Sequence, residues 1–470
     1  MSKEEKSNLE KKLLFEKKSC WEKWDEKKKQ KAFKFCDGYK DFLSNAKTER
    51  ESVKKGIKIA QANRFISIDE FKKKKSGNKI YFVNKDKNLA LVKLGKDLLK
   101  DGVNFIVSHI DSPHLDLKVR PLYEEESMAF FKTHYYGGIK KYHWPTIPLA
   151  LHGVIITKDG RKQEINIGEK EDEPIFMITD LLPHLARKQL TKTLKEAIEG
   201  EELNIVVGSI PVQDKKIKEK IKIAILEHLN KKYKIIEEDF FSAELQAVPT
   251  GKARDLGFDR SLIAGYGQDD RICAYTSLQA ILDSNETDRT QICFWTDREE
   301  VGSEGVSGLK SVFLESLLLE LLEVSNKESS LKNVYKIFER SEALSSDVTA
   351  GFDPDYKQVY DPRNSARLGY GLAIEKHTGS GGKYSSSEAS AEYVYKIRDI
   401  LNKNKVSWQT AGLGRIDEGG GGTIAMYLAN RNIDTIDCGV ALLNMHAPME
   451  ISSKADVYSA YEAYKAFFKE

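Results

Sequence analysis

The chain has 470 residues, more than a single hydrophobic core usually supports, so we expect two domains. Its 75 lysines and arginines nearly balance 72 aspartates and glutamates, and the net charge of +3 provides no dominant basic field of the kind that binds nucleic acid. No run of roughly 18 apolar residues occurs, and the N-terminus lacks the apolar core and cleavage site of a signal peptide. Five scattered cysteines without a Cys-x-x-Cys pair favour a reducing compartment over disulfides or a thiolate zinc site. Together these features predict a cytoplasmic protein that binds neither membranes nor nucleic acid.

The first part of the chain changes from helical to strand periodicity. Residues 3–62 are charged and periodically apolar, which predicts two or three surface helices without a functional signal. Apolar runs at 80–83, 89–92 and 103–107 then predict three strands, the last of which runs into His109. Residues 119–254 contain strands of their own and a helix near 214–232 but no paired carboxylates, so we interpret them as an inserted second domain.

After residue 254 strands and helices alternate. We expect strands at 291–295 and 435–443, and helices at 271–282, 308–324, 386–402 and 452–468. Such alternation is typical of an α/β sandwich around a largely buried sheet. Residues 1–118 and 255–470 would therefore form one domain, and residues 119–254 the second.

Five short segments carry metal-binding side chains, each just after an apolar run. Two divalent cations that share a carboxylate need oxygen and imidazole donors, plus one further carboxylate that handles the proton of a water molecule. The segments supply this set and predict a hydrolase with two metal ions; they are Ser108-His109-Ile110-Asp111, Gln268-Asp269-Asp270-Arg271, Asp297-Arg298-Glu299-Glu300, Ser346-Asp347 and Met445-His446.

His109 and Asp111 are two residues apart at a strand end. If the chain stays extended, both side chains fall on one face, and Asp111 can select which nitrogen of His109 meets a metal ion. Taken alone, His109 would more simply be a strand-end histidine that is hydrogen-bonded to a neighbour.

Glu299 and Glu300 are adjacent, and neighbours on an extended segment point to opposite sides. We therefore assign Glu300 as a metal ligand and Glu299 as the general base, with a pKa tuned by the ions and by burial. The alternative is a pair of glutamates on an exposed turn.

Of four further candidate residues, three have a simpler alternative to binding a metal ion. Asp269 is assigned the bridging position, while Asp270 is assigned as a cap of the following helix. Asp347 could equally be a helix cap, and His446, before Ala447, a turn residue.

Five motifs of the chain resemble those of a known family. The motifs HIDSP, GQDDR, DREEVGSEG, SSDVTAGFDPDY and NMHAPME resemble the M18 metallo-aminopeptidases, the aspartyl aminopeptidase and aminopeptidase I group, in its bacterial aminopeptidase 1 branch. The resemblance runs from about residue 79 onward and implies a zinc-exopeptidase-type α/β/α sandwich with a mainly β insertion that serves in oligomerisation or as a lid. It further implies two zinc ions, with Mn or Co also suited to such donors; His109 and Asp347 would hold one ion, Glu300 and His446 the other, Asp269 would bridge them, and Glu299 would be the base.

The insertion resembles that of the same family around 144–152 and 179–184. In relatives a histidine that matches His152 reaches the active site of a neighbouring subunit and helps to stabilise an oxyanion. This implies a closed homo-oligomer, a dodecamer by resemblance. The competing interpretation of His152 is a core histidine on a strand.

Two glycine-rich segments resemble a nucleotide-binding loop only in part. Gly379–Lys383 does not match a phosphate loop, because His377 stands where a glycine is required and Tyr384 where Ser or Thr is required. The run Gly419–Gly422 precedes a helical segment, and the resemblance suggests that Gly420 and Gly421 line the substrate cleft; a flexible hairpin is the alternative. By the same resemblance Lys376 is a substrate contact.

These features predict an exopeptidase that removes single residues from free peptide N-termini, with a metal-bound water as the nucleophile. The acidic pair Asp417-Glu418 would disfavour acidic substrate side chains and favour neutral or basic ones. The alternatives are a di-metal deacylase or carboxypeptidase on the same scaffold, a metal-binding scaffold protein without catalysis, and a nucleotide-binding enzyme.

Overall fold

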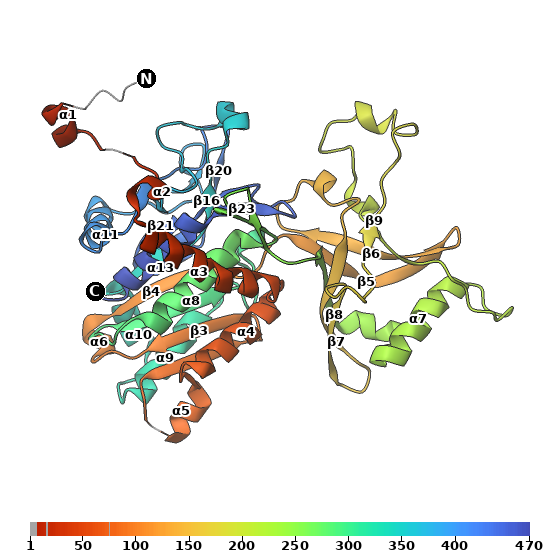
Figure 1. The fold of residues 1–470 in the computed structure, drawn as a ribbon. Helices are drawn as coiled ribbons and strands as arrows, with labels where there is room; N and C mark the ends of the chain where they lie inside the picture. Colours follow the sequence, from red (N-terminus) through yellow and green to blue (C-terminus); the bar gives the residue numbers. More distant parts are fainter. Residues whose placement is uncertain (1–6, 16, 75) are drawn as a thin grey trace.

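The computed structural model describes residues 7–15, 17–74 and 76–470, which form two lobes (Figure 1). The larger lobe surrounds a nine-stranded sheet, and the smaller lobe is built on a second, seven-stranded sheet. None of the described helices is long and apolar enough to cross a lipid bilayer.

The nine-stranded sheet places the ends of its central strands at one edge. β14, β4, β15 and β21 run parallel to one another, so their carboxyl ends lie together, where open α/β sheets usually carry their sites. In spatial order the strands are β1 (Ile66–Ser67), β2 (Lys79–Asn84), β3 (Asn88–Lys93), β14 (Thr290–Thr296), β4 (Val103–His109), β15 (Glu342–Ser345), β21 (Asp434–Gly439), β17 (Leu372–Glu375) and β19 (Trp408–Thr410).

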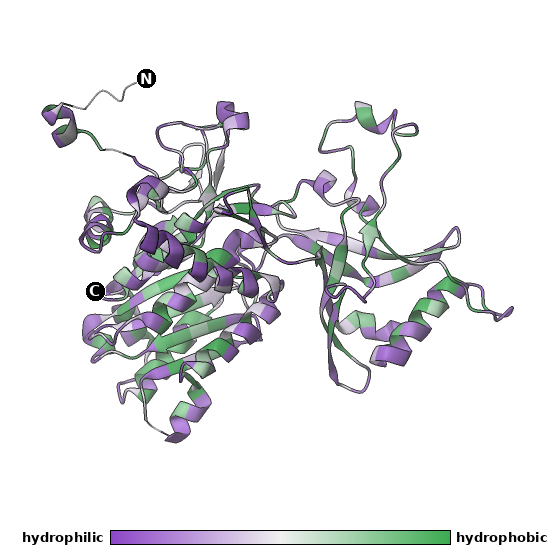
Figure 2. Ribbon diagram, viewed as in Figure 1, coloured by the Kyte–Doolittle hydropathy of each residue, from purple (hydrophilic) through white to green (hydrophobic). Residues whose placement is uncertain are grey.

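Helices cover both faces of this sheet, because its strands are apolar on both sides. In β4, Phe105 and Val107 pack into one core, and Ile106, between them, packs into the other. Figure 2 shows the hydrophobic residues concentrated in these strands. One core contains residues of α3 (Glu26–Ser44), α4 (Glu49–Ala62), α8 (Gln268–Asp283), α11 (Ala391–Lys403) and α13 (Lys454–Phe467), and the other those of α9 (Phe313–Val324), α10 (Leu331–Glu339) and α12 (Ala425–Ala429).

Several boundaries differ from the sequence prediction. The helix expected from residue 308 begins at Phe313, after a series of turns, and the helix expected from residue 386 begins at Ala391, where Ser390 caps it. The single strand expected at 435–443 is interrupted at Val440. Its first part is β21 of the nine-stranded sheet, and its second part, β22 (Ala441–Leu443), belongs to a separate five-stranded sheet. The N-terminal helices α1 (Asn8–Leu13), α2 (Cys20–Lys23), α3 and α4 are present, but α3 packs deeply, because Tyr39 and Phe42 are fully buried.

The second sheet is antiparallel and lies in the segment that the sequence assigns to an insertion. It packs on α7 (Lys220–Tyr233) around its own core. Its first strand begins at His114, five residues before the predicted boundary at 119, and its last strand in the chain ends at Pro249. In spatial order the strands are β8 (Lys162–Ile167), β7 (Leu149–Ile156), β11 (Ala243–Pro249), β5 (His114–Glu125), β6 (Met128–Tyr136), β10 (Ile205–Gly208) and β9 (Met177–Ile178).

Two smaller sheets complete the large lobe. A five-stranded sheet comprises β12 (Arg254–Leu256), β13 (Leu262–Gly265), β23 (Glu450–Ser453), β22 (Ala441–Leu443) and β16 (Thr349–Ala350). A two-stranded ribbon pairs β18 (Gly379–Ser380) with β20 (Gly420–Gly421). The loop between β22 and β23 carries His446.

Candidate metal centre

His109 lies buried at the end of β4, with its two ring nitrogens in different environments. Nε2 is 3.1 Å from Asp269 Oδ1 and 3.6 Å from Asp347 Oδ1. Nδ1 is 3.0 Å from the backbone oxygen of Asp111 and 3.3 Å from its carboxylate. Asp111 therefore holds Nδ1 and leaves Nε2 facing the acidic residues, in the geometry expected from their spacing.

Asp269 lies between two histidines. Its Oδ1 faces His109, and its Oδ2 is 3.2 Å from Nε2 of His446, so that each carboxylate oxygen points to a different imidazole. The buried Glu450 fixes both segments, because it accepts hydrogen bonds from the backbone of Gln268 at 2.6 Å, Asp269 at 3.2 Å and His446 at 2.9 Å. Sequence reasoning missed Glu450, although it closes the same motif that contains His446.

The backbone at Glu299 and Glu300 differs from the extended segment that the sequence predicts. Residues 299–301 form a 3₁₀ turn that follows a left-handed Arg298, so strand alternation does not apply here. Glu300 Oε2 is 3.5 Å from Nε2 of His446. The backbone amides of Glu299 and Glu300 donate to the two oxygens of Asp111 at 3.1 and 3.2 Å, which holds the turn against β4.

Asp270 does not cap the helix, so that assignment from the sequence is wrong. Both of its carboxylate oxygens are buried and have no hydrogen-bond partner among the described residues. They lie instead with His109 and Asp347, whose ligand atoms are all within 4.8 Å of one another; His109, Asp269 and Glu300 form a second such group. The described residues therefore include two overlapping groups that could hold a metal ion, with His109 common to both.

The buried carboxylates of the cluster repel one another, and added positive charge would stabilise them. Burial, reinforced by Asp347, raises the pKa of Glu299 to about 8. Burial also raises the pKa of Asp270 and Glu300 well above the usual range, and neighbouring carboxylates add to the effect. Burial alone would lower the pKa of His446, but Asp269 and Glu300 raise it to about 11. Divalent cations would relieve this repulsion, and the mixed imidazole and carboxylate donors fit zinc, with Mn or Co also compatible.

The glycine-rich segments form one structure. Gly379 pairs with Gly421, and Ser380 with Gly420, so the two runs that the sequence shows separately make one ribbon. A Cβ atom at Gly420 would lie 2.6 Å from the Gly379 oxygen, which explains the need for glycine there. Lys376 follows β17, is about half exposed and lies 3.6 Å from Glu388.

A buried acidic pair connects this ribbon to the sheet. Glu375 and Asp437 are paired across β17 and β21, and burial raises their pKa values to about 7 and about 8. Thr423, just after the glycine run, donates to Asp437 at 2.7 Å, and Thr349 donates to Glu375. Asp347 adds to both pKa shifts, so the base of the ribbon lies close to the metal cluster.

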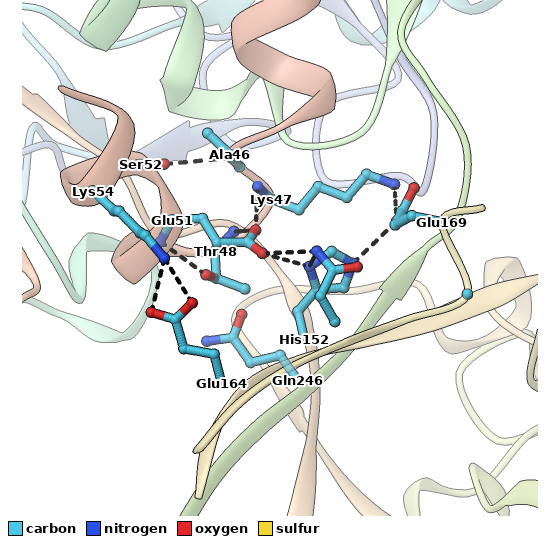
Figure 3. Close-up of polar contacts among 12 residues, drawn as sticks. Ala46, Lys47, Thr48, Glu51, Ser52, Lys54, His152, Glu164, Glu169 and Gln246 are labelled. Carbon is cyan, nitrogen blue, oxygen red and sulfur yellow. Dashed lines mark hydrogen bonds and ion pairs between the residues drawn. The ribbon is translucent and has the colours of Figure 1, made fainter. Parts of the chain in front are cut away.

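The structure places His152 outside the cluster, at a joint between the two lobes (Figure 3). His152 lies on β7 and is buried, with Nδ1 2.8 Å from Glu51 and Nε2 3.0 Å from Glu169. Lys47 donates to the same Glu169 oxygen at 2.5 Å and to the Pro249 carbonyl at 2.8 Å. Both ring nitrogens are thus occupied within the chain, as a buried structural histidine requires.

Comparison with known proteins gives a consistent result along the whole chain. A family model described as aminopeptidase I zinc metalloprotease (M18) matches residues 42–468. A probable M18 family aminopeptidase 1 of Clostridium acetobutylicum is 50% identical over 459 residues, 97% of this chain and 98% of that one. The crystal structure of an M18 family aminopeptidase from Thermotoga maritima matches with a TM-score of 0.93 at 44% identity, over 97% of this chain and 100% of that one. Aminopeptidase I from Clostridium acetobutylicum matches with a TM-score of 0.90 at 46% identity, over the same shares. These structures confirm the predicted α/β fold class.

Removal of divalent cations should destabilise the protein, because the buried carboxylates then repel one another. We expect zinc, manganese or cobalt at a hundredfold excess over the dissociation constant to add about 2.7 kcal/mol to the free energy of unfolding. Thermal unfolding of chelator-treated protein, with and without each ion, measures this. Calcium, which prefers six to eight oxygen ligands, is the control and should stabilise less. Equal melting temperatures with and without zinc would contradict the metal-site assignment.

The contacts of His152 with Glu51 and Glu169, which form the joint between the lobes, should stabilise the protein most at mildly acidic pH. Burial opposes protonation, but hydrogen bonds to Glu169 and Glu51 raise the pKa of His152, so its contribution is full below the unfolded pKa of about 6.5 and declines as the pH rises through the folded value. The pKa values of Glu51 and Glu169 are lowered, mainly by His152 against the effect of burial, so their contribution is present above about pH 4.3 and declines below.

His152→Gln should therefore cost roughly 1–3 kcal/mol between about pH 4.5 and 6.5, and less at higher pH. Denaturant unfolding across this range, at fixed protein and metal concentration, measures the difference. His134→Gln, which removes an exposed histidine of the same sheet, is the control. A cost that grows with pH would contradict the charged joint.

Proposed function

The chain belongs to the M18 family of zinc metallo-aminopeptidases, and we propose that it releases single amino acids from free peptide N-termini by means of two divalent cations held in the cluster. One observation carries the proposal: the two oxygens of Asp269 each face the Nε2 atom of a different histidine, at 3.1 and 3.2 Å. This is the arrangement that a carboxylate shared by two ions requires. We assign His109 and Asp347 to one ion, Glu300 and His446 to the other, and Asp269 to both.

Zinc is the cation that we assign, since both histidines present Nε2 and the remaining donors are carboxylates. Such a pair of ions, when bound, acidifies water and polarises the scissile carbonyl. Asp270 could also bind the ion that we assign to His109 and Asp347, because its carboxylate has no hydrogen-bond partner in the part of the chain that the structure describes and lies with these two residues. We add Asp270 to the ligand candidates as a result.

Glu299 is the general base in this proposal. Burial, reinforced by Asp347, raises its pKa to about 8, so without cations this carboxylate would hold a proton at neutral pH. Bound cations would lower this pKa and leave Glu299 ionised and ready to take the proton of the attacking water. Glu299 then delivers that proton to the leaving amine.

The substrate would lie between the cluster and the glycine ribbon. Thr423 and Asp437 fix the base of the ribbon beside Asp347, which supports the assignment of Gly420, Gly421 and Lys376 as substrate contacts. The exposed Asp417-Glu418 pair just before the ribbon supports a preference for neutral or basic N-terminal residues.

We propose that the chain assembles as a homo-oligomer in which residues 119–254 act as the oligomerisation or lid domain. The Saccharomyces cerevisiae mApe1 dodecamer shares the fold at 20% identity with a TM-score of 0.74, and a dodecamer is our assignment here. The contacts of His152 with Glu51 and Glu169 favour a structural role over one in a neighbouring active site. The five cysteines are free and buried, which supports a cytoplasmic location.

A free α-amino group should be essential for cleavage. We expect an aminoacyl anilide to be hydrolysed and its N-acetylated form to be inert, because an aminopeptidase site recognises the amine. Comparison of the two initial rates with zinc-loaded protein tests this. Faster cleavage of the acetylated compound would indicate the deacylase alternative, and cleavage of neither compound or of any free peptide would indicate a scaffold without catalysis.

Glu299→Gln should retain both metal ions and lower kcat by about 10²–10⁴-fold, because the variant keeps the shape of the side chain but cannot accept a proton. Asp269→Ala should instead lose metal. Elemental analysis together with steady-state kinetics separates these effects. The control is Glu304→Gln, an exposed glutamate that pairs with Lys310 in the same segment. Near-normal turnover by Glu299→Gln would contradict the assigned base.

A further inference from the structure

One short segment of the second sheet, Tyr136–Gly138 at the end of β6, contacts the residues of the metal cluster. The Tyr136 hydroxyl donates to Asp111 Oδ2 at 2.8 Å. The Gly138 carbonyl lies 2.8 Å from Nδ1 of His446. Between them, Gly137 packs so closely on Glu300 that an added Cβ atom would lie 3.3 Å from Oε2.

Asp111 is the point at which Tyr136 acts. This fully buried carboxylate accepts from the backbone amides of Glu299 and Glu300, faces Nδ1 of His109, and receives the Tyr136 hydroxyl. An ionised carboxylate needs several donors when it is buried, and the loss of one donor weakens its hold on the others. Tyr136 thus helps to fix the orientation of His109 and the turn at 299–300.

The Tyr136 ring is itself held in place. It stacks on His114, its cross-strand neighbour, with ring centres 4.4 Å apart and planes 14° from parallel. His114 is anchored at both nitrogens, at 2.8 Å to the Ser112 carbonyl and 3.0 Å to Asp116. The hydroxyl is therefore aimed at Asp111 by packing within the second sheet.

The Gly138 carbonyl fixes the other histidine. A carbonyl can only accept, so Nδ1 of His446 carries a proton, and with a cation bound it is the lone pair of Nε2 that would be directed toward Asp269 and Glu300. Glycine at 137, with φ +76°, lets the backbone turn at this point without contact between a side chain and Glu300.

We propose that Tyr136–Gly138 is the arm through which the second sheet positions the ligands of both metal ions, with Tyr136 as a positioning residue that acts through Asp111 on His109. The inference rests on the proposed function, because it concerns the same cations. It makes metal affinity depend on how the second sheet is docked, although that sheet supplies none of the assigned ligands.

Tyr136→Phe removes only the hydroxyl and keeps the ring stacked on His114. We expect its zinc affinity to fall by about 10–100-fold in competition with a chromophoric chelator, which is typical when an outer partner of a ligand is lost. The visible spectrum of the cobalt-loaded variant should also change, while the melting temperature of the metal-free protein should not. Tyr135→Phe makes the same chemical change one residue earlier, on the opposite face of β6, and is the matched control.

Gly137→Ala tests the contact with Glu300. Gly160→Ala is its control, because Gly160 has φ +79° but nothing within 4 Å of an added Cβ atom, so only the backbone strain is shared. We expect Gly137→Ala to lose about tenfold or more in zinc affinity relative to Gly160→Ala.

The outcomes separate the two proposals. Wild-type protein that binds no zinc in this titration would overturn the proposed function itself. Tight zinc binding by the wild type, with Tyr136→Phe and Gly137→Ala equal to their controls, would overturn only the positioning arm.

Discussion

The structure depends on a concentration of carboxylates in a place where water cannot screen them. Glu299, Glu300 and Asp347 follow the parallel strands β14 and β15, and Asp269 and Asp270, at the start of α8, are brought together with them. Removal of each charge from water costs several kcal/mol unless it is compensated. Two imidazoles compensate only part of this charge, and the raised pKa values of four of these five residues express the remainder. Bound cations turn this cost into affinity, which is why the cluster suits metal ions better than an internal salt bridge.

The orientation of the proposed metal ligands depends on residues to which we assign no metal ion. Asp111 and Glu450 are buried carboxylates that accept backbone amides from the ligand segments, at 299–300 and at 268–269 and 446. Each joins two segments that are distant in the sequence. A fixed first layer of side chains needs such support, because a shift of a fraction of an ångström changes coordination.

The sequence identified the family through its resemblance to known motifs, and it located the strand ends and the ligand candidates because each candidate follows an apolar run. It was insufficient where the outcome depends on tertiary contacts. The left-handed Arg298 that precedes the turn at Glu299 and Glu300 has no signal in the composition. Asp270 looked like a helix cap, but Glu450, from far along the chain, accepts the backbone amides at the start of that helix. The contact of Gly138 with His446 spans 308 residues, and the pairing of Gly379 with Gly421 joins two runs that look unrelated. Sequence periodicity indicates which face of a strand is buried, but it does not indicate which distant residues contact that face.

Two of the contacts between the second sheet and the larger lobe lead to residues of the candidate metal centre. The Tyr136–Gly138 arm contacts Asp111, Glu300 and His446. The joint at His152 and Glu169 holds Lys47 and Glu51, and the carbonyl of the preceding Ala46 accepts from the buried Arg271 at 2.7 Å. Arg271 directly follows Asp269 and Asp270, so the joint is connected to these residues through Arg271. A small rotation of the second sheet would therefore move several residues of the candidate metal centre together, so the geometry of that centre depends on both docked lobes rather than on the large sheet alone.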